Sequence, residues 1–285
     1  MPLGALVLIL LSAAAHATWN YLYKLTPEKA LFSWSFCALA SLLFLPLGLG
    51  VLVTVGLPWP GPVYLAGTML LHALYFAFLG RAYAQGDLSL TYPVARGTGV
   101  LLTPLLGALF LGESVSPVAV LGIATIVGGL LVVHGVVRPA KVLAALRAPG
   151  ARAALATGLV IAGYSVWDKQ GVGVVSPLLY NYAVFLAQAL AAAPVALRRR
   201  SALRALWRRH WPAIGAAAVL SPLAYLLVLV AMTVARVSYV APAREIGIVF
   251  GTALGVVLLR EPAGRLRLLG AALITLGVVI LALAP

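Results

Sequence analysis

Apolar segments of about twenty residues recur from one end of this chain to the other. Of its 285 residues, 63% are hydrophobic and only 9% are charged, whereas soluble domains carry about 25% charged residues. A helix of about 20 apolar residues crosses a hydrocarbon core of about 30 Å. In lipid, the backbone hydrogen bonds of such a segment must be satisfied within it. The sequence therefore predicts an all-α integral membrane protein.

We expect ten transmembrane helices joined by short loops. Their predicted ranges are 3–23, 30–54, 62–84, 89–111, 115–137, 153–173, 176–197, 212–234, 238–259 and 266–284. The first range is expected to be a retained span, because it lacks the basic start and the cleavage site of a signal peptide. Cys37 is the single cysteine, which excludes an internal disulfide, and no metal-ligand spacing is present. We therefore expect no metal and no cofactor.

Lysine and arginine are distributed unequally between the predicted loops. Sixteen of them fall on alternate loops, beginning with the loop after the first segment, while the opposite loops carry only Lys169 and Arg236. The positive-inside rule places the basic loops in the cytoplasm. This predicts a multi-pass protein of the cell inner membrane with both termini outside. We interpret the basic run at 198–210 as a topology determinant beside anionic lipid, and we expect no nucleic-acid partner.

The chain contains an internal repeat. Two stretches align without gaps at an offset of 148 residues: VARGTGVLLTPLLGALFLGESVSPVAVLGIATIVGG from Val94, and PAREIGIVFGTALGVVLLREPAGRLRLLGAALITLG from Pro242. The matched polar and glycine positions are Arg96 and Arg244, Gly99 and Gly247, Gly107 and Gly255, Glu113 and Glu261, Gly122 and Gly270, and Gly129 and Gly277. We therefore predict two five-helix repeats, residues 1–150 and 151–285. Five is odd, so the second repeat is inverted, as is typical of secondary transporters.

Several motifs resemble one family. They are the LGES at 111–114, the LLREP at 258–262, the apolar segment after each of them, and the Trp19-Asn20 pair before Lys24. With the two-times-five plan, they resemble the drug/metabolite transporter (DMT) superfamily, specifically its EamA-type members. Known relatives export amino acids, drugs or other metabolites, and some import sugars or nucleotide sugars.

The resemblance implies a central cavity between the repeats. Its lining would come from 62–84, 89–111, 212–234 and 238–259, and its sides would be closed by 3–23 and 153–173. Many relatives keep both termini inside, so the outside termini predicted from the loop charges of this chain are a departure.

Two arginines inside spans give the sharpest candidates for a site. Arg96 and Arg244 are equivalent in the repeat, and an arginine at mid-span costs a few kcal/mol even on insertion scales. Each must therefore face water, an acid or an anion. Glu245 could reach Arg96 across the pseudo-twofold as a structural ion pair, or it could belong to a substrate site. An arginine left free would bind a carboxylate, phosphate or phosphonate.

Two histidines lie within spans and are candidates for the cavity lining. His16, Trp19 and Asn20 share one helical stripe, although Trp19 could be an interfacial anchor and His16 could bond a neighbouring helix. His72 lies near mid-span with Tyr75 on the same face. An ionisable group there is a functional candidate, and the alternative is a buried histidine between helices.

Aromatic residues and prolines complete the predicted site. Tyrosines and a tryptophan at matching depths are candidates for its lining: Tyr92, Tyr164, Trp167, Tyr225 and Tyr239. Prolines interrupt the fourth, eighth and ninth segments, which makes 89–111 and 238–259 the predicted moving parts. We interpret Glu113 and Glu261 as structural carboxylates at helix starts. Asp168 could close a gate with a basic loop residue, but we interpret Asp168 and Lys169 as a solvated helix end.

These features predict a secondary transporter that exports a small polar metabolite by alternating access, and not an enzyme. An amino acid or related carboxylate is the leading substrate, with an organic phosphate or phosphonate or a cationic drug as alternatives. Cationic-drug antiport needs an embedded carboxylate in an early helix of a repeat, and 30–54 and 176–197 contain none. The alternatives outside transport are a membrane-embedded enzyme and a scaffold. The expected partners are the substrate, the lipid bilayer and protons as a candidate coupling ion, in a monomer or weak dimer.

Overall fold

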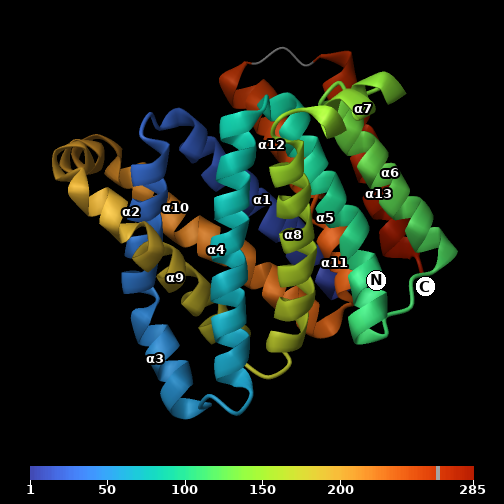
Figure 1. Cartoon of the computed structure of the whole chain (residues 1–285). Helices are drawn as coiled ribbons and strands as arrows, with labels where there is room; N and C mark the ends of the chain where they lie inside the picture. Colours follow the sequence, from blue (N-terminus) through green and yellow to red (C-terminus); the bar gives the residue numbers. More distant parts are fainter. Residues whose placement is uncertain (261–263) are drawn as a thin grey trace.

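The computed structural model of the chain describes residues 1–260 and 264–285, and the regular structure of these residues is all helical (Figure 1). The first half contains α1 (Leu3–Leu25), α2 (Lys29–Leu43), α3 (Leu45–Thr54), α4 (Gly61–Gln85), α5 (Leu88–Leu111), α6 (Pro117–Val133) and α7 (Pro139–Arg147). The second contains α8 (Ala151–Gly171), α9 (Pro177–Arg198), α10 (Arg200–Val234), α11 (Val237–Ala243), α12 (Ile246–Leu259) and α13 (Arg265–Leu283).

Each of the ten predicted segments coincides with a helix or with a pair of helices. The segment 30–54 consists of α2 and α3, which meet at a bend of 45°. Pro46 lies in the first turn of α3 and has no N–H to continue the hydrogen bonds of α2. Two helical stretches were not predicted, because they lie in basic loops: α7 and the part of α10 before the non-helical residue His210.

Length and apolarity identify the membrane-spanning helices. Among the described residues, seven helices are long and apolar enough to cross a membrane, or eight if α2 and α3 form one bent span. Large apolar side chains are exposed on the outside of the bundle, including Leu109, Val257 and Leu283. Such a surface requires lipid around it. The chain is therefore a multi-pass membrane protein, and the count of ten spans stays a prediction.

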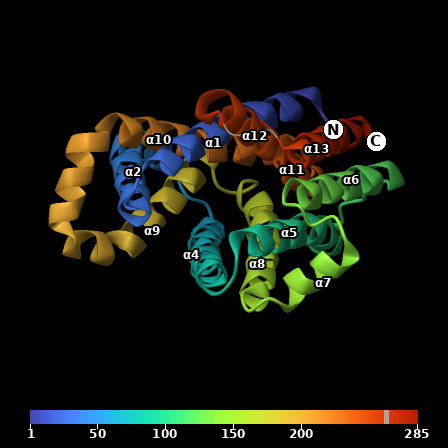
Figure 2. The same ribbon diagram turned by 90° about the horizontal axis from the view of Figure 1, so that it is seen from above.

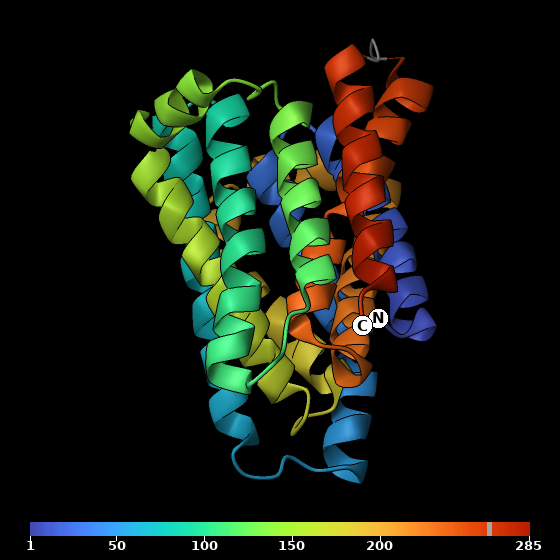
Figure 3. The ribbon, with the colours of Figure 1, turned by 90° about the vertical axis from the view of Figure 1, so that its right-hand side faces the viewer.

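Helices α6 and α13 lie side by side and touch through glycines (Figure 3). A Cβ atom on Gly129 would lie 2.8 Å from the carbonyl oxygen of Gly270, and one on Gly122 would lie 2.9 Å from that of Gly277. The contact is reciprocal, since a Cβ on Gly270 or Gly277 would meet the carbonyl oxygen of Gly129 or Gly122 at 2.7 Å. Only glycine allows two helix backbones to approach this closely.

The other helices are packed across the two halves of the chain. Helix α1 packs against α10 and α12, and α8 packs against α4 and α5 (Figure 2). By the sequence alignment, the first helix of each half thus contacts the third and fourth helices of the other half. Buried side chains around Ile9, Met232 and Ile274 form the larger apolar cluster, and a second cluster surrounds Phe36 and Ile214. This packing surrounds the polar groups described next.

Candidate functional site

The polar centre of the molecule lies where α11 ends and α12 begins. Pro242 lacks an N–H, and the chain passes through Arg244 and Glu245 with bonds of the tighter i to i+3 type, such as Gly247 N–H to the Arg244 carbonyl at 3.0 Å. Short stretches of this kind within a helix often mark a functional hinge. Two charged residues, Arg244 and Glu245, therefore lie at a break inside the segment 238–259.

Glu245 forms an ion pair with Arg96 of α5. The Nη2 atom of Arg96 lies 2.5 Å from Oε1 of Glu245, and its Nε lies 3.4 Å from Oε2. The Glu245 side chain is 3% exposed and that of Arg96 is 22% exposed. Of the two alternatives that the sequence left open for Arg96, the structure has the ion pair.

Arg244 has a different environment from its counterpart Arg96. Its guanidinium lies 5.8 Å from the ring centre of Tyr225 on α10, within the range of a cation–π contact. Among residues 1–260 and 264–285, no carboxylate pairs with it. The alignment explains the asymmetry, because the position equivalent to Glu245 in the first repeat is Gly97. One arginine is thus neutralised and the other is not.

Both arginines line a narrow cleft between α5, α8 and the break. The other polar groups of its wall are Thr103, Tyr164, Ser165 and Glu245. The free space in it is about 10 Å³, which is roughly the room needed for one water molecule. The cleft is closed in this conformation, and a metabolite could enter it only after the helices move apart.

An aromatic cluster lies next to the cleft and is centred on His72 of α4. Its imidazole stacks on Tyr164 at 4.5 Å between ring centres and meets the edge of Tyr225 at 5.5 Å. The Nδ1–H of His72 donates to the Thr68 carbonyl at 2.9 Å, which leaves Nε2 as an acceptor. Tyr75 joins the cluster at 6.0 Å from Tyr164. The structure thus brings His72, Tyr75, Tyr164 and Tyr225 together with Arg244.

Asp168 is the polar residue that the sequence analysis misinterpreted. Its side chain is fully buried and accepts hydrogen bonds from the hydroxyls of Tyr180 on α9, at 2.8 Å, and of Tyr225. The expectation of a solvated helix end was wrong, because α9 and α10 cover this side of α8. The signal available in the sequence was an acid inside the predicted span 153–173 rather than beyond its end.

The stripe predicted on α1 divides between two environments. His16 is exposed and faces α12, where a Cβ on Gly247 would lie 4.0 Å from its Cδ2. Trp19 packs against Phe36 of α2 at 5.5 Å, and its buried Nε1 has no partner. The side-chain amide of Asn20 donates to the carbonyl of His16 on its own helix. Only His16 of this stripe faces the α12 side.

Three predicted aromatic residues lie apart from the His72 cluster. Trp167 fills the space over Gly67 on α4, where a Cβ would come within 2.3 Å of its indole, and donates to the Tyr64 carbonyl. Tyr92 packs against His134 at 5.1 Å. Tyr239 donates to the carbonyl oxygen of Pro285. These contacts are those expected of packing residues.

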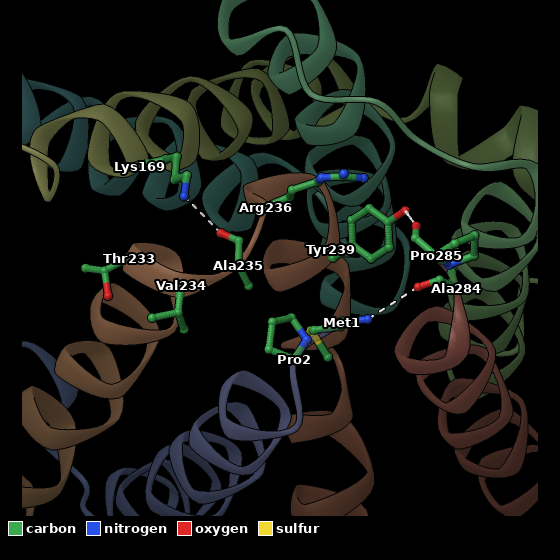
Figure 4. Close-up of a pocket in the computed structure, with 10 residues that line it drawn as sticks. All are labelled: Met1, Pro2, Lys169, Thr233, Val234, Ala235, Arg236, Tyr239, Ala284 and Pro285. Atoms are coloured by element: carbon green, nitrogen blue, oxygen red, sulfur yellow. Dashed lines mark hydrogen bonds between the residues drawn. The ribbon is translucent and has the colours of Figure 1, made fainter.

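Tyr239 borders a second, larger cavity beside the two chain ends, which we call the terminal pocket (Figure 4). It has a volume of about 440 Å³, and Lys169, Arg236, Met1 and Pro285 are among its lining residues. The ammonium of Lys169 donates to the carbonyls of Met232, at 2.5 Å, and Ala235, at 3.0 Å, at the end of α10. The two basic residues of the sparsely charged loops therefore converge here.

Glu113 is structural, as predicted. It stabilises the start of α11 rather than the start of α6, the helix that follows it in the chain. Its two carboxylate oxygens accept from the backbone N–H groups of Val237 and Ser238, both at 2.9 Å, and from the Ser238 hydroxyl. It therefore caps α11 and connects the first half of the chain to the break. Its counterpart Glu261 lies outside the described residues.

Comparison with known proteins identifies the family. Residues 148–283 match the model of the EamA-like transporter family, and residues 62–126 match that of the Small Multidrug Resistance protein. The second half of the chain is thus similar to the EamA-like transporter family. The resemblance expected from the sequence is confirmed, and the family is one of membrane transporters.

The EamA-like region contains Asp168, Tyr225, Arg244 and Glu245, while His72 and Arg96 lie in the other matched region. A solved crystal structure, titled only as that of a protein, is 22% identical and shares the fold with a TM-score of 0.72, covering 99% of this chain and 96% of that one. No curated protein matches the chain significantly.

Proposed function

We propose that the chain is a secondary transporter that exports an amino acid or a related carboxylate by alternating access, with Arg244 binding the carboxylate of the substrate. The observation that carries this proposal is the asymmetry between two equivalent arginines. Arg96 is neutralised by Glu245, while Arg244 lies over Tyr225 at the cleft without an acid partner among the described residues. A guanidinium in such a place binds carboxylate or phosphate in two-point geometry.

The proposal includes ten spans in two inverted repeats, 1–150 and 151–285. The glycine contacts between α6 and α13 support it, because each glycine contacts the counterpart of the other: Gly122 meets Gly277, and Gly129 meets Gly270. Such an exchange is the signature of a two-fold interface. The crossed packing of α1 and α8 supports it too. Substrate sites of inverted-repeat transporters lie at the repeat interface, often at a broken helix, as the cleft does here.

The remaining parts of the site follow from the contacts around Arg244. We propose that Tyr164, Tyr225, His72 and Tyr75 enclose the substrate side chain, and that His16 closes the α12 side. The ion pair of Arg96 and Glu245 holds α5 to the break. The family resemblance supports export. The charges of the loops support an inner-membrane location with both termini outside.

A thermal-stability screen of the purified protein in detergent tests this proposal. The panel contains the common amino acids, organic phosphates and phosphonates, and quaternary amines. A ligand at a hundred times its Kd stabilises the folded state by about 2.7 kcal/mol. We expect this stabilisation from a carboxylate compound and its loss in Arg244→Gln, with little change in the melting of the unliganded variant.

Two control variants make the result specific. Arg96→Gln removes the ion pair, so its own melting temperature should fall. Arg236→Gln removes an arginine at the terminal pocket and should retain the ligand response. If the carboxylate compound stabilises Arg244→Gln as well as the wild type, the substrate is bound elsewhere and the proposal is wrong.

Cationic-drug antiport is the second candidate. The match of residues 62–126 to the Small Multidrug Resistance protein favours it, and so does Asp168, an embedded carboxylate in the first helix of the second half. Stabilisation by the quaternary amines alone, lost in Asp168→Asn but not in Arg244→Gln, would replace the carboxylate substrate with a cation.

A further inference from the structure

Asp168 differs from the other acids of the described residues in how its charge is balanced. Glu28 is paired with Arg199 at 2.9 Å on the surface, Asp87 is exposed, Glu113 is bound by backbone N–H groups, and Glu245 is paired with Arg96. Asp168 is fully buried, and the partners of its carboxylate oxygens are two tyrosine hydroxyls. Among the described residues, it is the fully buried acid whose carboxylate is bound neither by a cation nor by backbone N–H groups.

A buried charge without a counter-ion is expensive in a membrane protein, and such residues commonly take part in ion or proton pathways. We propose that Asp168 is the proton-binding site that couples a proton gradient to substrate movement. This inference rests on the proposed transport function and assigns its coupling step to one carboxylate. The proton binds a carboxylate oxygen from the water on one side and leaves to the water on the other.

Tyr225 connects Asp168 to the substrate site. Its hydroxyl donates to Asp168, while its ring lies under the Arg244 guanidinium at 5.8 Å and beside His72 at 5.5 Å. An ionised carboxylate accepts from both tyrosines, but a protonated one has a donor of its own. On protonation, one hydroxyl must therefore turn or move away. Because Tyr180 is fully buried and Tyr225 borders the cluster, Tyr225 is the partner that responds.

The terminal pocket begins one residue along α8 from Asp168. Lys169, the next residue along α8, lines this pocket of about 440 Å³. Successive helix positions point about 100° apart, so the Asp168 carboxylate points away from Lys169 and toward Tyr180 and Tyr225. The charged and titratable groups around it are His72 and Tyr64 of α4, Tyr180 of α9, Tyr225 of α10, Arg244 at the break, and Lys169 itself, whose ammonium is held by backbone carbonyls.

Infrared spectroscopy of the protein in lipid bilayers, without any substrate, tests the proton site directly. A protonated carboxyl gives a C=O stretching band that is separate from the carboxylate bands. We expect acidification of the wild type to produce such a band, with one component that is missing from Asp168→Asn and is kept by the surface control Glu28→Gln. The same band in Asp168→Asn as in the wild type would overturn the proposal.

A second variant keeps the test decisive if Asp168→Asn does not fold. Tyr225→Phe keeps the ring but removes a donor that favours the charged carboxylate. The loss of this hydrogen bond should therefore shift the frequency of the carboxyl band relative to the wild type. The control Tyr182→Phe alters a tyrosine of α9 that packs on Gly48 and should leave the band at its wild-type frequency. An unshifted band in Tyr225→Phe would contradict the assignment.

Transport measurements in proteoliposomes then separate coupling from substrate binding. The probe is a radiolabelled mixture of the common amino acids. When a pH gradient is imposed, the wild type should accumulate label against the concentration gradient of the label. In Asp168→Asn this accumulation should fall at least tenfold, while exchange of label without a pH gradient continues. The proposal would be overturned if accumulation still depended on the pH gradient in Asp168→Asn and lost that dependence in His72→Gln instead. If the wild type moves none of the mixture while its Asp168 band titrates, the proposed substrate is wrong and the proton site stands.

Discussion

Replacing Gly129 by alanine tests how closely α6 and α13 approach. The new Cβ would lie 2.8 Å from both the Gly270 carbonyl oxygen and the Ile274 backbone nitrogen, whereas ordinary Cβ contacts begin at 3.4 Å. The two backbones would have to part by about 0.6 Å, and overpacking of this kind costs about 1–3 kcal/mol. At about 2 kcal/mol, the melting temperature should fall by about 4–8 °C for a chain of this size.

The neighbouring glycine provides the control. A Cβ on Gly128 would meet nothing within 4 Å, so Gly128→Ala should gain helix propensity of up to about 1 kcal/mol. Thermal unfolding in detergent, followed by tryptophan fluorescence, compares the two variants. Gly277→Ala, the counterpart of Gly129→Ala, should melt as early as that variant does. If Gly129→Ala melts at or above Gly128→Ala, the helices do not touch through their backbones and the reasoning is refuted.

Three further predictions concern single contacts. Arg96→Met leaves Glu245 buried without a counter-ion and should lower the unfolding free energy by about 3 kcal/mol. The double variant with Glu245→Met should recover most of this loss. If the effects of the two substitutions on thermal unfolding simply add, the ion pair is contradicted. Gly67→Ala places a Cβ 2.3 Å from the Trp167 indole and should cost about 1–3 kcal/mol, while Gly80→Ala, open on the same helix, should melt no earlier than the wild type does. Glu113→Gln weakens charge-assisted bonds worth about 1.5–3 kcal/mol, so hydrogen exchange at Val237 and Ser238 should speed up about tenfold or more, with Asp87→Asn as an unaffected control.

The helical architecture could be predicted because lipid leaves few alternatives. A chain with so little charge has to place its apolar segments in a membrane, and each segment has to be helical. The interruptions were harder to place. The bend at Pro46 and the break after Pro242 depend on how neighbouring helices satisfy the freed carbonyls, which no local pattern specifies. Helix α7 was missed because a short basic amphipathic stretch has the composition of a loop.

Site residues could be predicted where a polar side chain is costly in lipid. They could not be predicted where the packing of neighbouring helices decides which way a side chain points. Arg96, Arg244 and His72 were identified because a polar group within a span needs a reason to be there. Asp168 was misread because its place at the end of α8 looks solvated until α9 and α10 cover it. Trp167 and Tyr239 share the depth and chemistry of the site aromatics, but the gap at Gly67 and the Pro285 carbonyl direct them elsewhere. Depth follows from the sequence, and direction depends on the neighbouring helices.

The backbone contact between α6 and α13 also bears on how the protein could be assembled from pieces. The two helices belong to different halves and are joined by glycine surfaces that match without any covalent link. The basic loop between α6 and α8 then serves as a tether that raises the local concentration of one half around the other. Cutting the chain there and expressing the pieces together should still give an intact bundle.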